Sequence, residues 1–295
     1  GSTRPAQDRC GDRQARAPGL VARAPGSPGV RRETAAVCEE PFPDFPLCPM
    51  ALREEMVRAG NWLSRWRSYL PLLVLALVIG SLTSFEYPRG SHTRDRAWEL
   101  FCFSVSLLGL AVRSLAVGHA SRGTSGRDTR CPVAERLNTT GMYSIVRHPL
   151  YLGNFLIWSG VGLFPREWWL TLVVLLVFAL YYERIMFAEE EFLRDRFGDA
   201  FLEWAERTPA FIPKLSLWKP PDLPFSVRTV LKREYSGFFG IIATFTALEV
   251  LGDYAAAGRW EIDPLWAALF GAGALAYLTL RFLKRKTRVL DVEGR

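Results

Sequence analysis

Cysteine is scarce in this chain of 295 residues, and its placement argues against the usual cysteine chemistries. The five cysteines are Cys10, Cys38, Cys48, Cys102 and Cys131. No two of them have the spacing of metal ligands, and an odd number does not give a disulfide framework. We therefore expect no bound metal and no disulfide-stabilised fold.

The chain also lacks a continuous basic face, although it is basic overall. Its 37 lysines and arginines outnumber its 30 acidic residues and give a net charge of +7. Many of these basic residues lie close to apolar segments, which is typical of charges that orient a protein in a membrane. No nucleic-acid partner is expected.

Apolar residues, in contrast, are abundant and gathered in blocks. They make up 49% of the chain, and aromatic residues make up 13%. The predicted fold class is all-α, a polytopic integral membrane helical protein with about six spans. The predicted spans are residues 69–85, 97–117, 150–164, 168–187, 235–251 and 264–283. Because only three residues join the third and fourth spans, these two form a short helical hairpin. Arg113, near the end of the second span, is expected to extend to the membrane surface.

Residues 1–50 differ in composition from the rest of the chain. They hold eight of the nineteen prolines, seven arginines and no lysine. Such a segment is predicted to be disordered, and it lacks the apolar core of a signal peptide. The chain does not begin with methionine, and Met50 and Met56 precede the first ordered-looking segment, so an over-extended reading frame is one hypothesis for residues 1–49. Residues 51–295 form the predicted membrane-embedded domain.

Charges in the connections predict the orientation of the spans. Residues 118–149 and 188–234 are rich in arginine and lysine, whereas residues 252–263 are acidic. Because positive charge stays in the cytoplasm, both basic loops and both termini are predicted to be cytoplasmic. The connection at residues 86–96, with three arginines, fits this topology less well.

The stretch from Asn138 to Asn154 is a polar and aromatic run that leads into an apolar one. Pro149 suits the first turn of a helix, so Arg147 and His148 are predicted to lie at its N-terminal end, which favours an anionic ligand group. Tyr143 and Tyr151 flank this end, and their rings suit a cation such as a sulfonium. The alternative is that Arg147 and His148 are interfacial residues beside a transmembrane helix that begins with proline.

An acidic run follows the predicted hairpin, at Glu189, Glu190 and Glu191. The hairpin is antiparallel, so it returns these residues to the level of His148 at which it began. A carboxylate there suits ribose hydroxyls or an ammonium group. For Glu191 we favour the alternative, a solvated acidic residue on a surface helix.

The order of these motifs resembles a known family. The pattern Gly-x-Tyr-x-x-x-Arg-His-Pro-x-Tyr-x-Gly, a short hairpin, an acidic run, Phe-Gly and Pro-x-x-x-Pro is similar to the isoprenylcysteine carboxyl methyltransferases and their phospholipid methyltransferase relatives. The resemblance covers residues 128–214, the predicted cofactor-binding core, and leaves two extra C-terminal spans at 235–283. It implies an integral membrane enzyme that uses S-adenosyl-L-methionine without a soluble Rossmann domain. The absence of a glycine-rich nucleotide fingerprint agrees with this.

The resemblance also implies roles for individual residues. The cofactor-binding residues that it implies are Leu137, Asn138, Tyr143, His148, Pro149, Leu150, Tyr151 and Glu189. Arg147 and Arg184 are the residues expected to hold the methyl acceptor. Apart from the resemblance, the residues themselves offer no obvious base beyond His148 and Glu190. The chain departs from the family where it has Phe201 and Trp204 in place of tyrosines.

The acceptor is expected to be an anionic group of a membrane lipid or of a lipidated substrate. A phosphate or carboxylate needs only cationic positioning, whereas an amine must first lose a proton. Residues 123–127 and 137–141 resemble bacterial relatives that methylate a lipid phosphate, such as that of lipid A, which implies a bacterial inner membrane. The alternatives are a phospholipid N-methyltransferase, a non-catalytic membrane protein, and a sterol-reductase-like protein that uses a nicotinamide cofactor.

Overall fold

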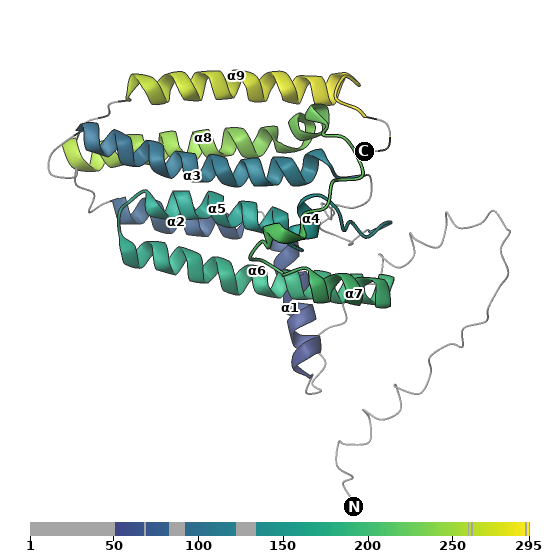
Figure 1. The fold of residues 1–295 in the computed structure, drawn as a ribbon. Coiled ribbons are helices and arrows are strands. Elements are labelled where there is room, and N and C mark those ends of the chain that lie inside the picture. The colour runs from purple at the N-terminus through teal and green to yellow at the C-terminus, as the bar shows by residue number, and fades with distance from the viewer. Residues whose placement is uncertain are drawn as a thin grey trace, which may run out of the picture. The chain divides into compact units, whose positions relative to one another are not determined.

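The computed structural model describes residues 51–67, 69–82, 92–121, 134–258, 260, 262–292 and 294, and within them it is helical (Figure 1). The helices are α1 (Leu52–Trp66), α2 (Leu70–Ser81), α3 (His92–Gly118), α4 (Met142–Ile145), α5 (Pro149–Leu163), α6 (Trp168–Phe197), α7 (Asp199–Arg207), α8 (Val227–Ala257) and α9 (Pro264–Lys286), with a 3₁₀ turn at Leu215–Leu217. The chain divides into two compact units, residues 1–55 and 56–295. The disorder predicted for residues 1–50 lies outside the described residues.

The all-α membrane fold is confirmed, and a helix occupies each of the six predicted spans. Among the described residues, four helices, α3, α6, α8 and α9, are long and apolar enough to cross a membrane. The other two are shorter, with 12 residues in α2 and 15 in α5. At about 1.5 Å per residue α5 measures roughly 22 Å, less than a hydrocarbon core of about 30 Å. The predicted positions of the spans therefore hold, including the 15-residue length of the third, whereas the number of full membrane crossings stays approximate because α2 and α5 are short.

Helix α3 packs against both α5 and α8, and its contact with α5 depends on glycine. A Cβ atom on Gly109 of α3 would lie 2.4 Å from the carbonyl oxygen of Gly153, and one on Gly160 would lie 2.4 Å from that of Cys102. Only a residue without a Cβ permits backbones to approach this closely. Gly153 thus serves the helix contact that places α5, and with it the residues at the start of α5.

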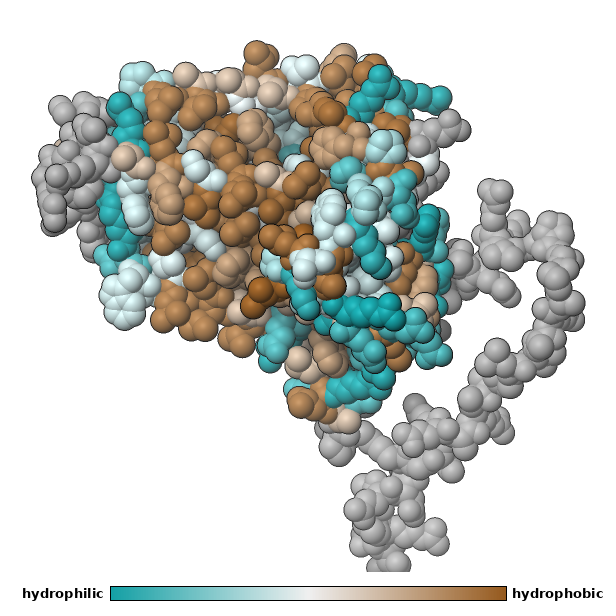
Figure 2. Space-filling model, viewed as in Figure 1, coloured by the Kyte–Doolittle hydropathy of each residue, from teal (hydrophilic) through white to brown (hydrophobic). Residues whose placement is uncertain are grey.

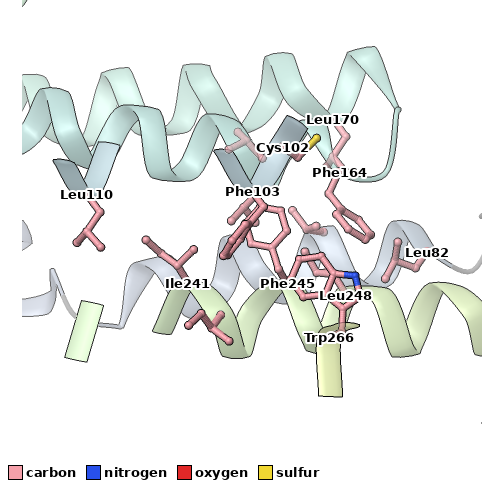
Figure 3. Close-up of a cluster of buried hydrophobic side chains, with 14 residues drawn as sticks. Leu82, Cys102, Phe103, Leu110, Phe164, Leu170, Ile241, Phe245, Leu248 and Trp266 are labelled. Carbon is pink, nitrogen blue, oxygen red and sulfur yellow. The ribbon is translucent and has the colours of Figure 1, made fainter. Parts of the chain in front are cut away.

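The main apolar core lies where α3, α5, α8 and α9 meet (Figure 3). Phe245 of α8 stacks on Trp266 of α9 with ring centroids 6.1 Å apart, and Phe103 of α3 meets both rings edge-on. Phe164, at the end of α5, adds a further edge contact to Phe245. Such aromatic contacts stabilise a pair by about 0.5–1.5 kcal/mol beyond the area buried. The C-terminal helices α8 and α9 are therefore built into the core of this unit.

Apolar side chains also cover the outside of the helices. Figure 2 shows hydrophobic residues over the middle of the viewed face and hydrophilic residues towards the helix ends. On α6, Leu172, Leu176 and Leu180 recur every fourth residue and are each about half exposed. Because a water-soluble surface would not carry such a stripe, this face suits lipid.

A tight turn at Pro165–Glu167 reverses the chain between α5 and α6, as predicted. Arg166 has a positive φ of 64°, which a non-glycine residue rarely adopts. Its guanidinium forms an ion pair with Asp95 at the start of α3. Helix α6 then runs without interruption to Phe197, where Gly198 (φ 54°) ends it and α7 begins. The Phe-Gly pair of the sequence pattern therefore lies at the boundary between two helices.

Arg113 differs from its prediction. Instead of reaching the membrane surface, it forms an ion pair with Glu234 of α8, and the side chain of Arg113 is only 18% exposed. Charge inside an apolar span is costly unless it is paired, and Glu234 supplies the partner from 121 residues away.

Candidate active site

A cavity of about 330 Å³ lies where the start of α5 meets the second half of α6 and α7. This volume is within the usual range of about 300–1,000 Å³ for small-molecule sites. Ten of the eleven residues singled out from the sequence line it: Leu137, Asn138, Tyr143, Arg147, His148, Pro149, Leu150, Tyr151, Glu189 and Glu190. The structure thus brings together residues from three separate stretches of the chain. Their individual roles remain predictions.

Helix α5 begins at Pro149, as predicted, and not earlier. The one-turn helix α4 ends at Ile145, and Val146 between them is extended. The backbone of the Arg-His pair is held by the segment that follows α7: Arg147 N–H donates to the Pro209 carbonyl (2.9 Å) and His148 N–H donates to that of Ala210 (3.2 Å). Residues about 60 positions apart therefore form one rigid wall of the cavity.

His148 connects both glutamates of the acidic run. Its Nε2 donates to Glu190 Oε1 at 2.8 Å, because an ionised carboxylate can only accept. Its Nδ1 lies 3.8 Å from Glu189 Oε2, and the hydroxyl of Tyr151 donates to Glu189 Oε1. The imidazole itself is 7% exposed. The antiparallel hairpin thus returns the acidic run to His148, as expected from the sequence.

Arg147 supplies a cation beside the same carboxylate. Its Nε lies 3.1 Å from Glu190 Oε1, and its Nη1 donates to the Ala205 carbonyl at 3.0 Å. The Nε atom is buried, yet its N–H makes no hydrogen bond of good geometry. Its contact with Glu190 is therefore an ion pair without a well-aligned hydrogen bond. A buried donor of this kind costs free energy until a ligand or a shift of the side chain satisfies it.

Aromatic rings form much of the remaining lining. His148 and Tyr151 are stacked with centroids 5.7 Å apart, and Phe201 of α7 contacts Trp204 at 5.8 Å. The Trp204 indole N–H donates to the Tyr143 carbonyl (3.2 Å), which ties α7 to α4. Burial raises the pKa of Tyr143 to about 12, so this ring stays uncharged at neutral pH. Uncharged electron-rich rings near carboxylates suit a sulfonium and an ammonium group.

Arg184 does not share this location. It is exposed on α6 and is not among the residues that line the cavity. Gly60 of α1 packs against its backbone, since a Cβ there would lie 2.1 Å from the Arg184 carbonyl oxygen. The prediction that Arg184 holds the acceptor is therefore not supported, because the cavity lies against a different face of α6.

Among the other residues that line the cavity, and that the sequence did not single out for the site, are Arg113, Asn154 and Tyr182. Arg113 was recognisable as a charge inside an apolar span, which commonly marks function. Asn154 lies one helical turn after Leu150 and Tyr151 and so shares their side of α5. Tyr182 gave no signal, because tyrosine is common at membrane interfaces.

Comparison with known proteins agrees with this arrangement. The family model of the phospholipid methyltransferases matches residues 102–200, so it begins earlier than the resemblance read from the motifs and ends before α7 is complete. It includes α5, most of α3 and all of α6. No solved structure matches the chain significantly.

Two of the similar curated proteins are bacterial and one is from a plant. The chain is 34% identical to the cobalt-zinc-cadmium resistance protein of Cupriavidus metallidurans over 54% of this chain and 69% of that protein. It is 31% identical to the nickel-cobalt-cadmium resistance protein of Alcaligenes xylosoxydans xylosoxydans over 52% of this chain and 65% of that protein. It is 34% identical to protein-S-isoprenylcysteine O-methyltransferase B of Arabidopsis thaliana over 38% of this chain and 58% of that protein.

The matched part thus ranges from about two thirds of the bacterial relatives down to just over half of the plant enzyme.

Within the part of the chain that the structure describes, no group of three or more histidine, cysteine, aspartate or glutamate side chains is placed to hold a metal ion. The membrane helices, the assembled cavity, the family model and the level of identity agree with one another: the chain belongs to the phospholipid methyltransferase family of membrane proteins.

Proposed function

We propose that this protein is an S-adenosylmethionine-dependent O-methyltransferase that methylates an anionic group, a lipid phosphate or the carboxylate of a prenylcysteine, at the cytoplasmic membrane surface. The observation that carries the proposal is the cavity in which Arg147, His148, Glu189 and aromatic rings meet. The sequence similarity to isoprenylcysteine O-methyltransferases supports the same reaction class.

The lining of the cavity fits the proposed cofactor by its chemistry. When bound, S-adenosylmethionine supplies an electrophilic methyl group on a positively charged sulfur. The rings of Tyr143 and Tyr151 suit that positive charge, and the carboxylate of Glu189 suits ribose hydroxyls or the ammonium group. The hydrogen bond from Tyr151 and the proximity of His148 hold the Glu189 carboxylate in place. These residues bind and orient, and they need not form or break covalent bonds.

The contacts of Glu190 favour an oxygen acceptor. A methyl transfer needs a nucleophile in line with the departing sulfur, and an amine must also lose a proton to a base. Glu190 Oε1 already accepts from His148 and lies beside the Arg147 cation. Both contacts engage the same carboxylate oxygen, which leaves it less available to take a proton from an amine. A phosphate or carboxylate acceptor needs no base, and Arg147, which lines the cavity, supplies a cation that can hold one of its oxygens.

The lipid nature of the acceptor is supported by the surroundings of the site. The cavity adjoins α6, whose outer face carries exposed leucines suited to lipid. The segment from 188 to 234, which carries part of the cavity wall, is rich in basic residues, and positive charge favours the cytoplasmic side. Together with the two bacterial relatives, this leads us to propose a bacterial inner membrane with both termini in the cytoplasm.

Binding measurements on the full-length protein in detergent test the cofactor. Isothermal titration with S-adenosylmethionine should give saturable binding, and titration with NADPH should give none. Mass spectrometry of lipids from expressing cells, grown with methyl-labelled methionine, should then find the label on a phosphate or carboxylate oxygen. Binding of NADPH alone would favour a reductase instead and contradict the proposal.

Phospholipid N-methylation is the second candidate, and the description of the matching family favours it. Under that alternative the labelled methyl group is found on a headgroup nitrogen. Tandem mass spectrometry of the same lipid extract distinguishes the two, because the labelled methyl group appears on a fragment that contains the headgroup nitrogen after N-methylation and on a phosphate or carboxylate fragment after O-methylation.

A further inference from the structure

A chain of hydrogen bonds leads from α8 to the cavity. Arg113 of α3 donates from Nε and Nη2 to the two oxygens of Glu234 of α8, at 2.9 and 3.0 Å. Its Nη1 donates to Asn154 Oδ1 of α5 at 2.7 Å. The side chains of Arg113 and Glu234 are 18% and 5% exposed. A buried bidentate ion pair fixes the plane of the guanidinium and therefore the direction in which its remaining nitrogen, Nη1, donates.

Arg113 fixes the orientation of the Asn154 side-chain amide. An arginine can only donate, so the opposite orientation of the amide would set two donors against each other at 2.7 Å. The amide nitrogen Nδ2 therefore faces α6 and donates to the hydroxyl oxygen of Tyr182 at 3.2 Å. Because the Tyr182 hydroxyl accepts this bond, its own proton is left for a different partner.

The surroundings of Tyr182 direct that proton to the cavity. Its ring stacks on Phe178 at 4.2 Å and contacts Tyr151 at 4.8 Å, and the residue is 7% exposed. The ring cannot swing away without breaking this packing. Tyr182 lines the cavity together with Asn154, the residue to which its hydroxyl is bonded, so we place the hydroxyl within reach of a ligand there.

We propose that Tyr182 donates its hydroxyl proton to an anionic oxygen of the ligand in this cavity, and that Glu234, acting through Arg113 and Asn154, is a positioning residue that sets the direction of this donor. The inference rests on the proposed function, since that function supplies the ligand. Two sources offer such an oxygen: the carboxylate of S-adenosylmethionine, and the phosphate or carboxylate of the acceptor.

Tyr182→Phe tests the donor, because it removes one oxygen and keeps the ring. Tyr181→Phe is the matched control: its hydroxyl donates to the Leu63 carbonyl at 2.8 Å, and Tyr181 does not line the cavity. Full-length protein in detergent is titrated with S-adenosylmethionine and with its decarboxylated analogue. Methyl transfer from labelled S-adenosylmethionine is measured with vesicles made from the lipids of the expression host.

A hydrogen bond to a charged oxygen predicts a loss of about ten-fold or more in the Tyr182→Phe variant. If the cofactor carboxylate is the partner, S-adenosylmethionine binds more weakly and the decarboxylated analogue binds with unchanged affinity. If the acceptor is the partner, cofactor affinity is unchanged and the KM for vesicle lipid rises. The inference is overturned if the cofactor affinity and the KM for vesicle lipid of Tyr182→Phe are both within two-fold of those of Tyr181→Phe. A wild-type protein that neither binds the cofactor nor methylates these lipids refutes the proposed function first, and the inference with it.

Asn154→Asp tests the direction of the chain. An aspartate still accepts from Arg113 but also accepts from the Tyr182 hydroxyl, which withdraws the proton from the cavity. It should reproduce the loss seen in Tyr182→Phe, and the double variant should lose no more than either single one. Glu234→Gln should likewise add nothing in the Tyr182→Phe background. Additive losses would mean that these residues act only on structure and would overturn the positioning role.

Discussion

At the residue scale, the site depends on cations and carboxylates that share atoms. Glu190 Oε1 is contacted by both His148 and Arg147, and Glu189 is held by Tyr151. Because each group restrains its neighbour, exchanging one side chain changes the position of the others as well as its own charge. Variants that keep shape and change one property therefore give the clearest tests.

We expect Arg147→Lys to leave the affinity for S-adenosylmethionine within two-fold and to lower turnover by about ten-fold or more, a loss of about 1.4 kcal/mol of transition-state stabilisation. A lysine keeps the charge but cannot offer the planar set of donors, one of which is the buried Nε–H of Arg147. Titration and initial rates measure the two effects separately. Arg184→Lys, outside the cavity, is the control and should behave as the wild type. Unchanged turnover in Arg147→Lys would point to an amine acceptor.

Glu189→Gln should weaken binding of S-adenosylmethionine by about ten-fold or more, since it removes the charge proposed to bind the ammonium or ribose groups. The variant keeps a similar shape and can still accept from Tyr151. Glu191→Gln is the matched control, two positions along α6, where the carboxylate lies 3.6 Å from Arg194. Isothermal titration measures both. Equal affinities in the two variants would remove Glu189 from the cofactor site.

At the scale of the elements, the contact between α3 and α5 places the whole wall that begins at Pro149. Gly109 and Gly153 bring the two backbones together, and Arg113 lies against the same contact, 2.4 Å from a Cβ built on Gly153. The short α5 cannot be positioned by its length in the membrane, so its packing against α3 decides its height and rotation. The positions of His148 and Asn154 follow from that packing.

Gly109→Ala should therefore lower the free energy of unfolding by about 1–3 kcal/mol, because the added methyl group meets the Gly153 carbonyl and forces the helices apart. Gly271→Ala in α9 is the control: no atom lies within 4 Å of a Cβ there, and alanine has the higher helix propensity. The midpoint of thermal unfolding in detergent measures both. A Gly109→Ala variant as stable as Gly271→Ala would show that the helix contact is loose.

At the scale of the whole molecule, charge distribution and the apolar outer surface define how the protein sits in a membrane. The segment with Lys214 and Lys219 follows the site, whereas Asp253 lies near the end of α8 and Asp263 immediately before α9. Since basic segments stay in the cytoplasm, these two regions are expected on opposite sides. The cavity then opens on the side where cytoplasmic S-adenosylmethionine is present.

Cysteine labelling measures this topology. In a chain whose own cysteines are replaced, Ser216→Cys should react with a membrane-impermeant thiol reagent only after the inner membrane is permeabilised. Ala257→Cys, at the C-terminal end of α8, should react in spheroplasts whose inner membrane is intact. The side chains of Ser216 and Ala257 are both exposed. The reverse pattern would place the cavity outside the cytoplasm and contradict the proposed location.

The sequence alone was enough to predict the features that depend on neighbouring residues. Long apolar runs located the helices and Pro149 marked the start of α5, because the length of an apolar run and the fixed φ of proline are properties of neighbouring residues. The ordered motifs also indicated the family and ten of the residues in the cavity wall.

Tertiary structure alone decided which of these residues act together. Arg147 and Arg184 look alike in sequence, yet only Arg147 lines the cavity, because α6 turns Arg184 to another face. Arg113 looked like a charge that reaches the membrane surface, and its partner Glu234 lies 121 positions away on a helix beyond the matched family region. Periodicity and spacing describe one element at a time, whereas a partner on another helix is selected by how glycine contacts and aromatic packing bring the helices together.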